Sequence, residues 1–313
     1  LVTAALYLMK PVLVPFTFSL FLFFIVAPII DWLRKKVKMP KSLAMLTSFI
    51  VLIMILVGIV LLLGVSLKGF VKSSDEYQIK LLALVDQFSV FSSSHGVNID
   101  LSLIRESVSK LPILDWVRHV SGSVVGIMGT ILLVFVITML LLMGKETGSD
   151  HSIMDEEVQS KITRYIATKC MTSAMTGLCV FIVLVLFKVQ LALMFGILTF
   201  FLNFIPNIGS LIALLLPLPI VFLQFGLSLT LIWVTIFTAV IQFVIGNIID
   251  PKVMGENLGL HPAIILLSLL FWGFIWGVPG MFLSVPMTAI IKLLLSRSKK
   301  TQSIAKILEG HFK

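Results

Sequence analysis

The sequence predicts an all-α integral membrane protein. Hydrophobic residues make up 58% of its 313 residues and charged residues only 12%, against roughly 25% charged in ordinary soluble domains. The apolar residues also fall in long blocks without Lys, Arg, Asp or Glu, at 12–30, 43–65, 124–143 and 227–249. A helix rises about 1.5 Å per residue, so a block of about twenty residues crosses the hydrocarbon core of a bilayer.

The first apolar stretch and the basic residues predict how the chain is threaded. Residues 1–9 are interpreted as the end of a helix that begins before Leu1, because they lack the basic start and cleavage site of a signal peptide. Positively charged segments beside membrane helices stay in the cytoplasm. This rule places the loop 31–41 and the C-terminal tail inside. We therefore assign the net charge of +9 to topology and not to nucleic-acid binding.

This threading divides the chain into four parts. They are N-terminal membrane helices (1–67), an extracytoplasmic helical insert (68–120), a membrane transport core (121–295) and a basic cytoplasmic tail (296–313). Within the insert, Asp100 can cap a short amphipathic helix that Pro112 ends. We expect the insert to shield the mouth of the protein, and contact with substrate is the alternative.

Two segments of the core, 191–225 and 263–295, are predicted to be broken helical hairpins. The first is interrupted by Asn203-Phe-Ile-Pro-Asn-Ile-Gly209 and the second by Gly277-Val-Pro-Gly280. Proline removes a backbone donor, so further breaks are expected at Pro217, Pro219 and Pro286. Irregular backbone at membrane depth survives only where protein buries it or where it lines a wet cavity. Two such hairpins of opposite orientation are typical of secondary transporters with a central site, and ordinary kinked spans are the alternative.

The candidate solute or ion path begins at these breaks. Asn203 and Asn207 flank Pro206, and their amides could hold a polar solute or a cation. The alternative is that they only satisfy the broken backbone. The residues that permit the breaks belong to the same predicted path: Gly209, Gly277, Pro279 and Gly280.

Four further polar residues complete the predicted path. Gln242 and Asn247 lie near the end of the next span, where they could face one cavity or form hydrogen bonds between helices. Asp250 follows and could couple proton or cation movement to a conformational change, with Lys252 as its counter-charge. A turn with a salt bridge at the membrane surface is the alternative. His261 is expected to start a helix at Pro262.

The sequence offers little for soluble-type catalysis. Its five histidines lack metal-ligand spacing, and no phosphate-binding loop of the Walker type is present. Cys170 and Cys179 are predicted to lie on opposite faces of one helix. We therefore expect no enzyme activity, metal or organic cofactor, and we expect the coupling partner to be H⁺ or Na⁺.

Several motifs resemble the AI-2E family of bacterial membrane proteins, the PerM-type permeases. They are the segment 203–209, Asp250-Pro-Lys-Val-Met-Gly255, Leu258-Gly-Leu-His-Pro262 and Gly277-Val-Pro-Gly-Met281 with Val285-Pro286. The resemblance implies about eight membrane segments, and it implies a homo-oligomer, a pentamer, that exports small polar molecules without ATP. Some members export the signal autoinducer-2, and others resemble sodium/proton antiporters. Asn207 departs from the pattern, because many relatives have an aromatic residue there, so the solute stays open.

The leading hypothesis is a secondary transporter of the bacterial inner membrane that exports a small polar solute, such as an autoinducer-2-like signal, by alternating access. One alternative is a monovalent cation (Na⁺ or Li⁺)/proton antiporter with Asp250 as the titrating group. Another is a non-transporting scaffold that binds partner proteins through the insert.

Overall fold

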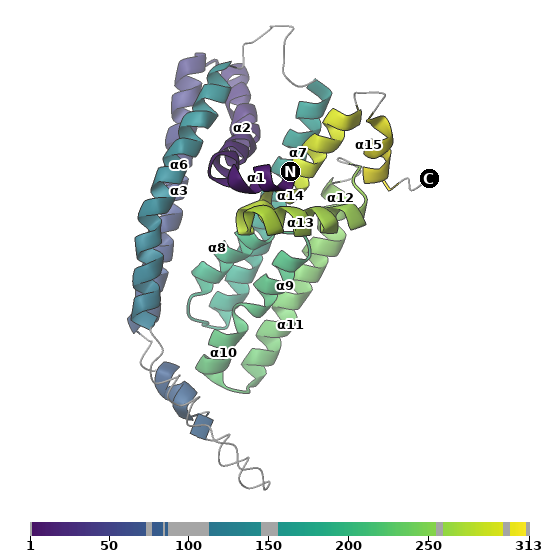
Figure 1. Cartoon of the computed structure of the whole chain (residues 1–313). Helices are drawn as coiled ribbons and strands as arrows, with labels where there is room; N and C mark the ends of the chain where they lie inside the picture. Colours follow the sequence, from purple (N-terminus) through teal and green to yellow (C-terminus); the bar gives the residue numbers. More distant parts are fainter. Residues whose placement is uncertain are drawn as a thin grey trace.

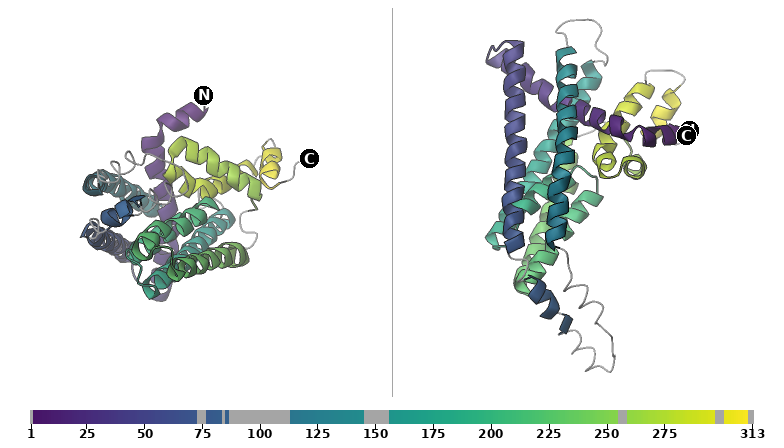
Figure 2. Two further views of the ribbon diagram at one scale, coloured as in Figure 1. Left: turned by 90° about the horizontal axis from the view of Figure 1, so that it is seen from below. Right: turned by 60° about the vertical axis from the view of Figure 1, so that its left-hand side comes forward.

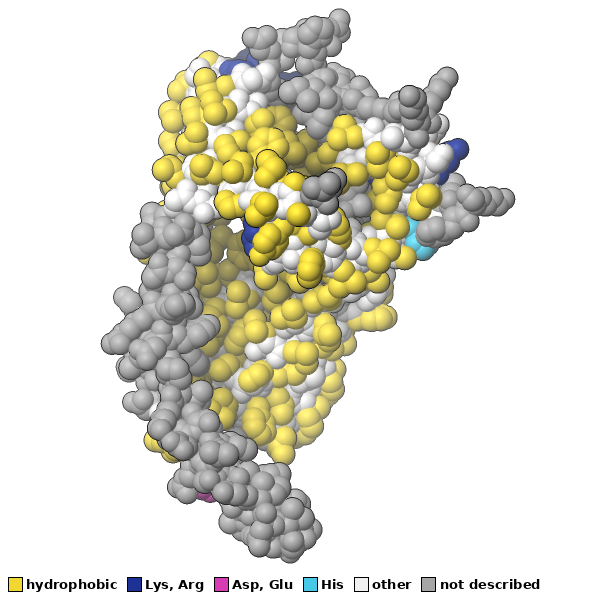
Figure 3. Space-filling view, viewed as in Figure 1, with side chains coloured by type: hydrophobic (Ala, Val, Ile, Leu, Met, Phe, Trp, Pro, Cys, Tyr) yellow, Lys and Arg dark blue, Asp and Glu magenta, His cyan; other side chains and the backbone are white. Residues whose placement is uncertain are grey.

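A computed structural model describes residues 2–72, 77–83, 85–86, 113–144, 156–254, 259–296 and 301–310. Within these ranges every regular element is a helix (Figure 1). Six helices among the described residues are long and apolar enough to cross a membrane, and hydrophobic side chains cover most of the described surface in Figure 3. The prediction of an all-α membrane protein is confirmed.

Among its described residues, the first part of the chain includes the helices α1 (Val2–Leu8), α2 (Lys10–Lys36), α3 (Lys41–Lys72) and α6 (Ile113–Gly144), and residues 77–83 are also helical. Helix α2 continues through Pro28 to Lys36, so the predicted loop 31–41 shrinks to 37–40. Neighbouring helices in a membrane can satisfy the carbonyl that a proline leaves free. Three of the basic residues of this region, Arg34, Lys35 and Lys36, therefore lie in the last turn of α2, where the negative end of the helix dipole favours them.

Two buried hydroxyl groups join α2 to α6. Ser19 Oγ donates to the carbonyl of Pro15 in its own helix at 2.7 Å and lies 3.0 Å from the carbonyl oxygen of Val134 in α6. Thr138 Oγ1 in turn lies 3.3 Å from the carbonyl oxygen of Ser19. Both side chains are fully buried. Because water cannot replace these contacts, they fix how α2 and α6 pack.

Replacing Ser19 with Ala is expected to lower the free energy of unfolding by about 0.6–1.7 kcal/mol, the range for hydrogen bonds between membrane helices. Thermal unfolding of the purified protein in detergent measures this change. Thr47→Val is the matched control, because the Thr47 hydroxyl contacts only carbonyls of its own helix, α3. Equal effects of the two substitutions would contradict the role assigned to Ser19.

The second part of the chain forms the remaining helices, which follow one another through short connections. They are α7 (Glu156–Leu186), α8 (Ala192–Leu202), α9 (Ile208–Leu215), α10 (Leu218–Phe225), α11 (Leu229–Val244), the π-helix η1 (Ile245–Ile249), α12 (Asp250–Met254), α13 (Pro262–Trp276), α14 (Val278–Ser296) and α15 (Gln302–Leu308). Helix α7 packs against α8, α11 and α12, and α13 packs against α14. Figures 1 and 2 show α13 lying across the direction of the long helices.

Both predicted interruptions are present, at slightly different residues. The chain turns between α8 and α9 at 203–207, and between α13 and α14 at Gly277, whose φ is +73°. Pro279 lies in the first turn of α14, where backbone N–H groups have no partner within the helix, so a proline is tolerated there. The break therefore lies before Pro279, at Gly277. Pro286 lies inside α14 and does not end it, which corrects the expected second break.

A glycine packs against the preceding helix at each interruption. A Cβ atom at Gly209 would collide with the carbonyl group of Leu202, the last residue of α8. A Cβ atom at Gly280 would collide with the carbonyl group of Trp272 in α13. Both chain reversals are therefore closed tightly, and a larger side chain cannot enter either one without moving the backbone.

Side-chain contacts join two short segments, one at Tyr77 and one at the C-terminal end of the described residues, to the longer helices. The hydroxyl of the buried Tyr77 donates to Gln190 Oε1 in the turn between α7 and α8. Near the C-terminus, the buried Lys292 of α14 lies 2.8 Å from Glu309, beyond α15. His261 caps α13, as expected, by accepting from Ala263 N–H. The predicted helix between Asp100 and Pro112 lies outside the described residues.

Candidate functional site

Helix α7 carries a row of buried polar side chains along one face. They are Lys169, Thr172, Ser173 and Thr176, at spacings that fall on one side of a helix. The two threonine hydroxyls donate to carbonyl groups of α7 itself. Lys169 and Ser173 instead reach groups on other segments, which makes this face of α7 the centre of the candidate site.

The first of these contacts is a buried ion pair. Lys169 Nζ lies 2.6 Å from Asp250 Oδ2, and the two side chains are 9% and 11% exposed. Lys169 lies well inside the apolar helix α7, and Asp250 is the first residue of α12. Charged groups inside membrane segments are costly and most often serve a function.

The partner of Asp250 is therefore not the one expected from the sequence. Lys252 is exposed, and Lys169, 81 residues away in the chain, makes the contact. The physical reason is helix geometry, since residues two apart on a helix do not face each other.

Two buried polar atoms, one at each end of the segment 242–250, have no hydrogen-bond partner. Asp250 Oδ1 is an unpaired acceptor, and Gln242 Nε2, in α11, is an unpaired donor. The two residues are 8% and 7% exposed. They lie on either side of the π-helix η1, a type of segment that is rare and often found at functional sites.

The two asparagines at the first interruption have different surroundings. Asn203 is buried, and its Nδ2 donates to Ser173 Oγ on α7 at 3.1 Å. Asn207 is exposed and has a φ of +58°, so its role here is to form the turn that precedes α9. Asn203 thus belongs to the polar face of α7, whereas Asn207 points away from it.

Asn247 also lies outside the buried group. It is exposed, and its Nδ2 lies 3.2 Å from the carbonyl oxygen of Phe243 in the preceding turn. Gln242 is buried, so the two residues have different surroundings, which argues against the alternative in which they face one cavity. Pro206, Gly209, Gly277, Pro279 and Gly280 shape the two interruptions and contribute backbone geometry.

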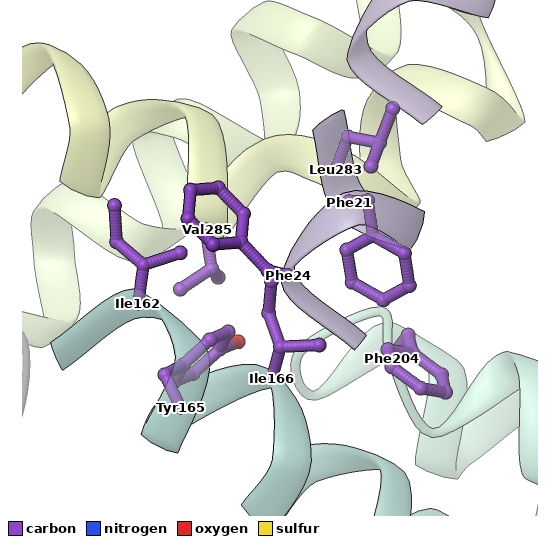
Figure 4. Packing of buried hydrophobic residues seen from close by; sticks show 8 residues of the cluster. All are labelled: Phe21, Phe24, Ile162, Tyr165, Ile166, Phe204, Leu283 and Val285. Carbon is purple, nitrogen blue, oxygen red and sulfur yellow. The ribbon is translucent and has the colours of Figure 1, made fainter. Parts of the chain in front are cut away.

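Aromatic side chains bring the two interruptions together. Phe204, in the first turn, stacks on Phe282 of α14 with ring centroids 4.5 Å apart, and Phe21 of α2 packs edge-on against both. Figure 4 shows Phe21 next to Phe204, and Phe24 among residues of α7. The first interruption and the helix that follows the second therefore meet through an aromatic contact.

The cavity next to this contact is apolar. It has a volume of about 130 Å³ and lies between α2, α7 and α14. Thr17 is the single polar residue of its lining, which otherwise includes Phe24, Ile166 and Leu283. Binding sites for polar solutes need several converging polar groups. This cavity therefore does not extend the polar site, and in this conformation the Lys169–Asp250 pair is closed off from it.

Lys169 is the residue that the sequence analysis missed. A signal for it exists, because Lys169 is the sole charged residue between Arg164 and Lys188. Such a residue indicates a functional site by default. Within the described part of the chain, no group of three or more His, Cys, Asp or Glu is placed to hold a metal ion.

A polytopic helical protein with interrupted membrane segments and a buried ion pair belongs to the class of membrane transport proteins. The sequence model of the protein family described as "AI-2E family transporter" matches residues 1–300. The chain therefore belongs to the AI-2E family. The multi-pass character and the resemblance seen in the sequence are thereby confirmed.

Relatives match over nearly their whole length. A Haemophilus influenzae relative is 31% identical over 330 residues, which cover 98% of this chain and 93% of the relative. The AI-2 transport protein TqsA of Escherichia coli K12 is 28% identical over 308 residues, with 95% and 89% covered. The protein YhhT of the same strain is 25% identical over 319 residues, with 98% and 90% covered.

Proposed function

We propose that this protein is a secondary transporter that exports a small polar solute by alternating access, with Asp250 binding the coupling cation. The observation that carries the proposal is the buried contact between Lys169 and Asp250 beside a π-helix. A carboxylate in such a place can exchange its ammonium partner for a proton or a metal cation. That exchange gives the transport cycle two states, which differ in the ion that neutralises Asp250.

The arrangement of the two interruptions supports movement of the second half of the chain. Asn203, at the first interruption, contacts the same face of α7 as the ion pair. Phe204, the next residue, packs against Phe282 of α14, the helix that follows the second interruption. A change at Asp250 can therefore reach both interruptions through α7.

We further propose that the C-terminus is cytoplasmic, because basic residues gather at the end of α2 and in the tail.

The name of TqsA makes autoinducer-2 the first solute to test. Liposomes that contain the purified protein and are loaded with autoinducer-2 are expected to release it saturably under a proton or sodium gradient. Protein-free liposomes measure the leak. Asp250→Ala should abolish the release, and Lys252→Gln should leave it unchanged, because Lys252 is exposed. Release that survives Asp250→Ala would exclude that carboxylate as the coupling group.

A second candidate function is exchange of Na⁺ or Li⁺ for protons, and the unpaired Asp250 Oδ1 favours it. Oxygen atoms are the ligands that such hard cations prefer. Replacing Asp250 with Asn removes the charge while keeping the shape of the side chain. We expect this variant to lose sodium-dependent proton movement in liposomes, followed with a pH-sensitive dye. If exchange is absent in the unmodified protein while autoinducer-2 is released, the second candidate is excluded.

A further inference from the structure

The ion pair leaves part of the polar site unused. Lys169 Nζ contacts Asp250 Oδ2, while Oδ1 of the same carboxylate is buried without a partner. Gln242, eight residues before Asp250 in the chain, is also buried and has an unpaired Nε2. Buried polar atoms normally have partners, and each exception asks for an explanation. Because the ammonium contacts only one of the two carboxylate oxygens, we infer that the carboxylate can also bind another ligand.

We propose that Lys169 is a tethered substitute for the coupling cation: its ammonium fills the Asp250 site while that site holds no monovalent metal ion, and it leaves when such an ion binds. The inference rests on the proposed binding of a coupling cation at Asp250. It adds that the empty site is already neutral, because lysine supplies the positive charge.

The need for such a substitute follows from burial. An unpaired carboxylate at this depth costs several kcal/mol, so a site with Asp250 alone would keep its cation or a proton at every step. With Lys169 in place, the unloaded protein can change conformation without an uncompensated charge. The transporter is then able to return empty, which permits net transport as well as exchange.

The position of Lys169 suits a displaceable group. Lysine carries its charge on a flexible four-carbon stem, so the ammonium can withdraw without movement of the backbone. Lys169 belongs to α7 and Asp250 to α12, so relative movement of these two helices separates them. A cation that binds at Asp250 Oδ1 would compete with the ammonium for the same negative charge.

This competition has a consequence that a purely structural lysine does not have. Replacing Lys169 with Met keeps the length of the side chain and removes the competitor. Sodium should then bind to Asp250 at lower concentration than in the unmodified protein. We expect the half-saturating Na⁺ concentration to fall about tenfold, equivalent to roughly 1.4 kcal/mol.

The experiment measures the unfolding temperature of the purified full chain in detergent against NaCl concentration, with choline chloride at equal ionic strength as the reference. A ligand that binds the folded state raises this temperature in proportion to its occupancy. Lys169→Met should be unstable in choline and recover as Na⁺ is added. Lys169→Met with Asp250→Asn should lose the response to Na⁺.

Lys292→Met is the matched control, because Lys292 is also buried and paired, with Glu309. It should destabilise the protein without changing the response to Na⁺. If Lys169→Met binds Na⁺ no more tightly than the unmodified protein, or behaves like Lys292→Met, the inference is wrong. Since this readout is binding, an absence of flux in liposomes would overturn the proposed function alone.

A second measurement uses the unmodified protein, in case the variant does not fold. Reductive methylation followed by mass spectrometry reports how accessible each lysine amine is. Na⁺ should increase methylation of Lys169, because the displaced ammonium leaves Asp250, and should not change that of Lys292. Equal methylation of Lys169 in Na⁺ and in choline would overturn the inference.

Discussion

Replacing Asp250 with Ala is expected to lower the free energy of unfolding by about 3–5 kcal/mol, because it leaves the Lys169 ammonium buried without a counter-charge. Lys169 is 7% exposed, so water reaches it poorly. Unfolding in detergent, followed by the fluorescence of the protein's tryptophans, measures the loss. Lys252→Ala, at an exposed position of the same helix, is expected to change stability little.

Removing both charges together should restore most of that stability. Lys169→Met combined with Asp250→Leu replaces the pair with apolar side chains of similar volume, which is often neutral for folding. The double variant should therefore fold but fail to couple transport to a cation. If Asp250→Ala costs no more than Lys252→Ala, the ion pair does not form in the folded protein.

The second large effect is expected at the two glycines of the interruptions. Gly209→Ala and Gly280→Ala should each lower the free energy of unfolding by about 1–3 kcal/mol or more, because the added methyl group meets a backbone carbonyl and not a flexible side chain. Neither position can relax unless the two helices on either side of the turn separate. Thermal unfolding in detergent is again the measurement.

Gly58→Ala and Gly64→Ala in α3 are the controls for these substitutions. A Cβ atom at either position has open space around it. In a helix interior, alanine is favoured over glycine by roughly 0.5–1 kcal/mol, so these variants should be neutral or slightly more stable. A loss at Gly58 equal to that at Gly209 would show that close packing at the interruption is not the cause.

The fold class could be predicted from the sequence because a membrane-spanning helix is recognisable from its apolar composition and its length alone. The interruption at 203–207 followed for a related reason, since the chemistry of Pro206 and its neighbours is local. Pro286 shows the limit of that argument, because its effect depends on what surrounds the helix. It lies inside α14, where the fold tolerates the missing donor.

The candidate site was only partly predictable. Asp250 and Asn203 could be singled out because a polar residue in an apolar stretch is visible in the sequence. Their partners, Lys169 and Ser173, depend on the packing of α7 against α12 and on the turn after α8, which no local pattern encodes. Asn207 and Asn247 look equivalent to Asn203 in the sequence, and only the direction of each side chain separates them.

The π-helix η1 has a rotational consequence for the site. Each residue of an α-helix turns the chain by about 100°, and a π turn holds one residue more than an α turn. If η1 rewound as an α-helix, the chain beyond it would rotate by about this angle relative to α11. Asp250, which follows directly, would swing off the side that faces α7 and away from Lys169. A change of winding over a few residues can thus make or break the ion pair while the helix keeps its axis.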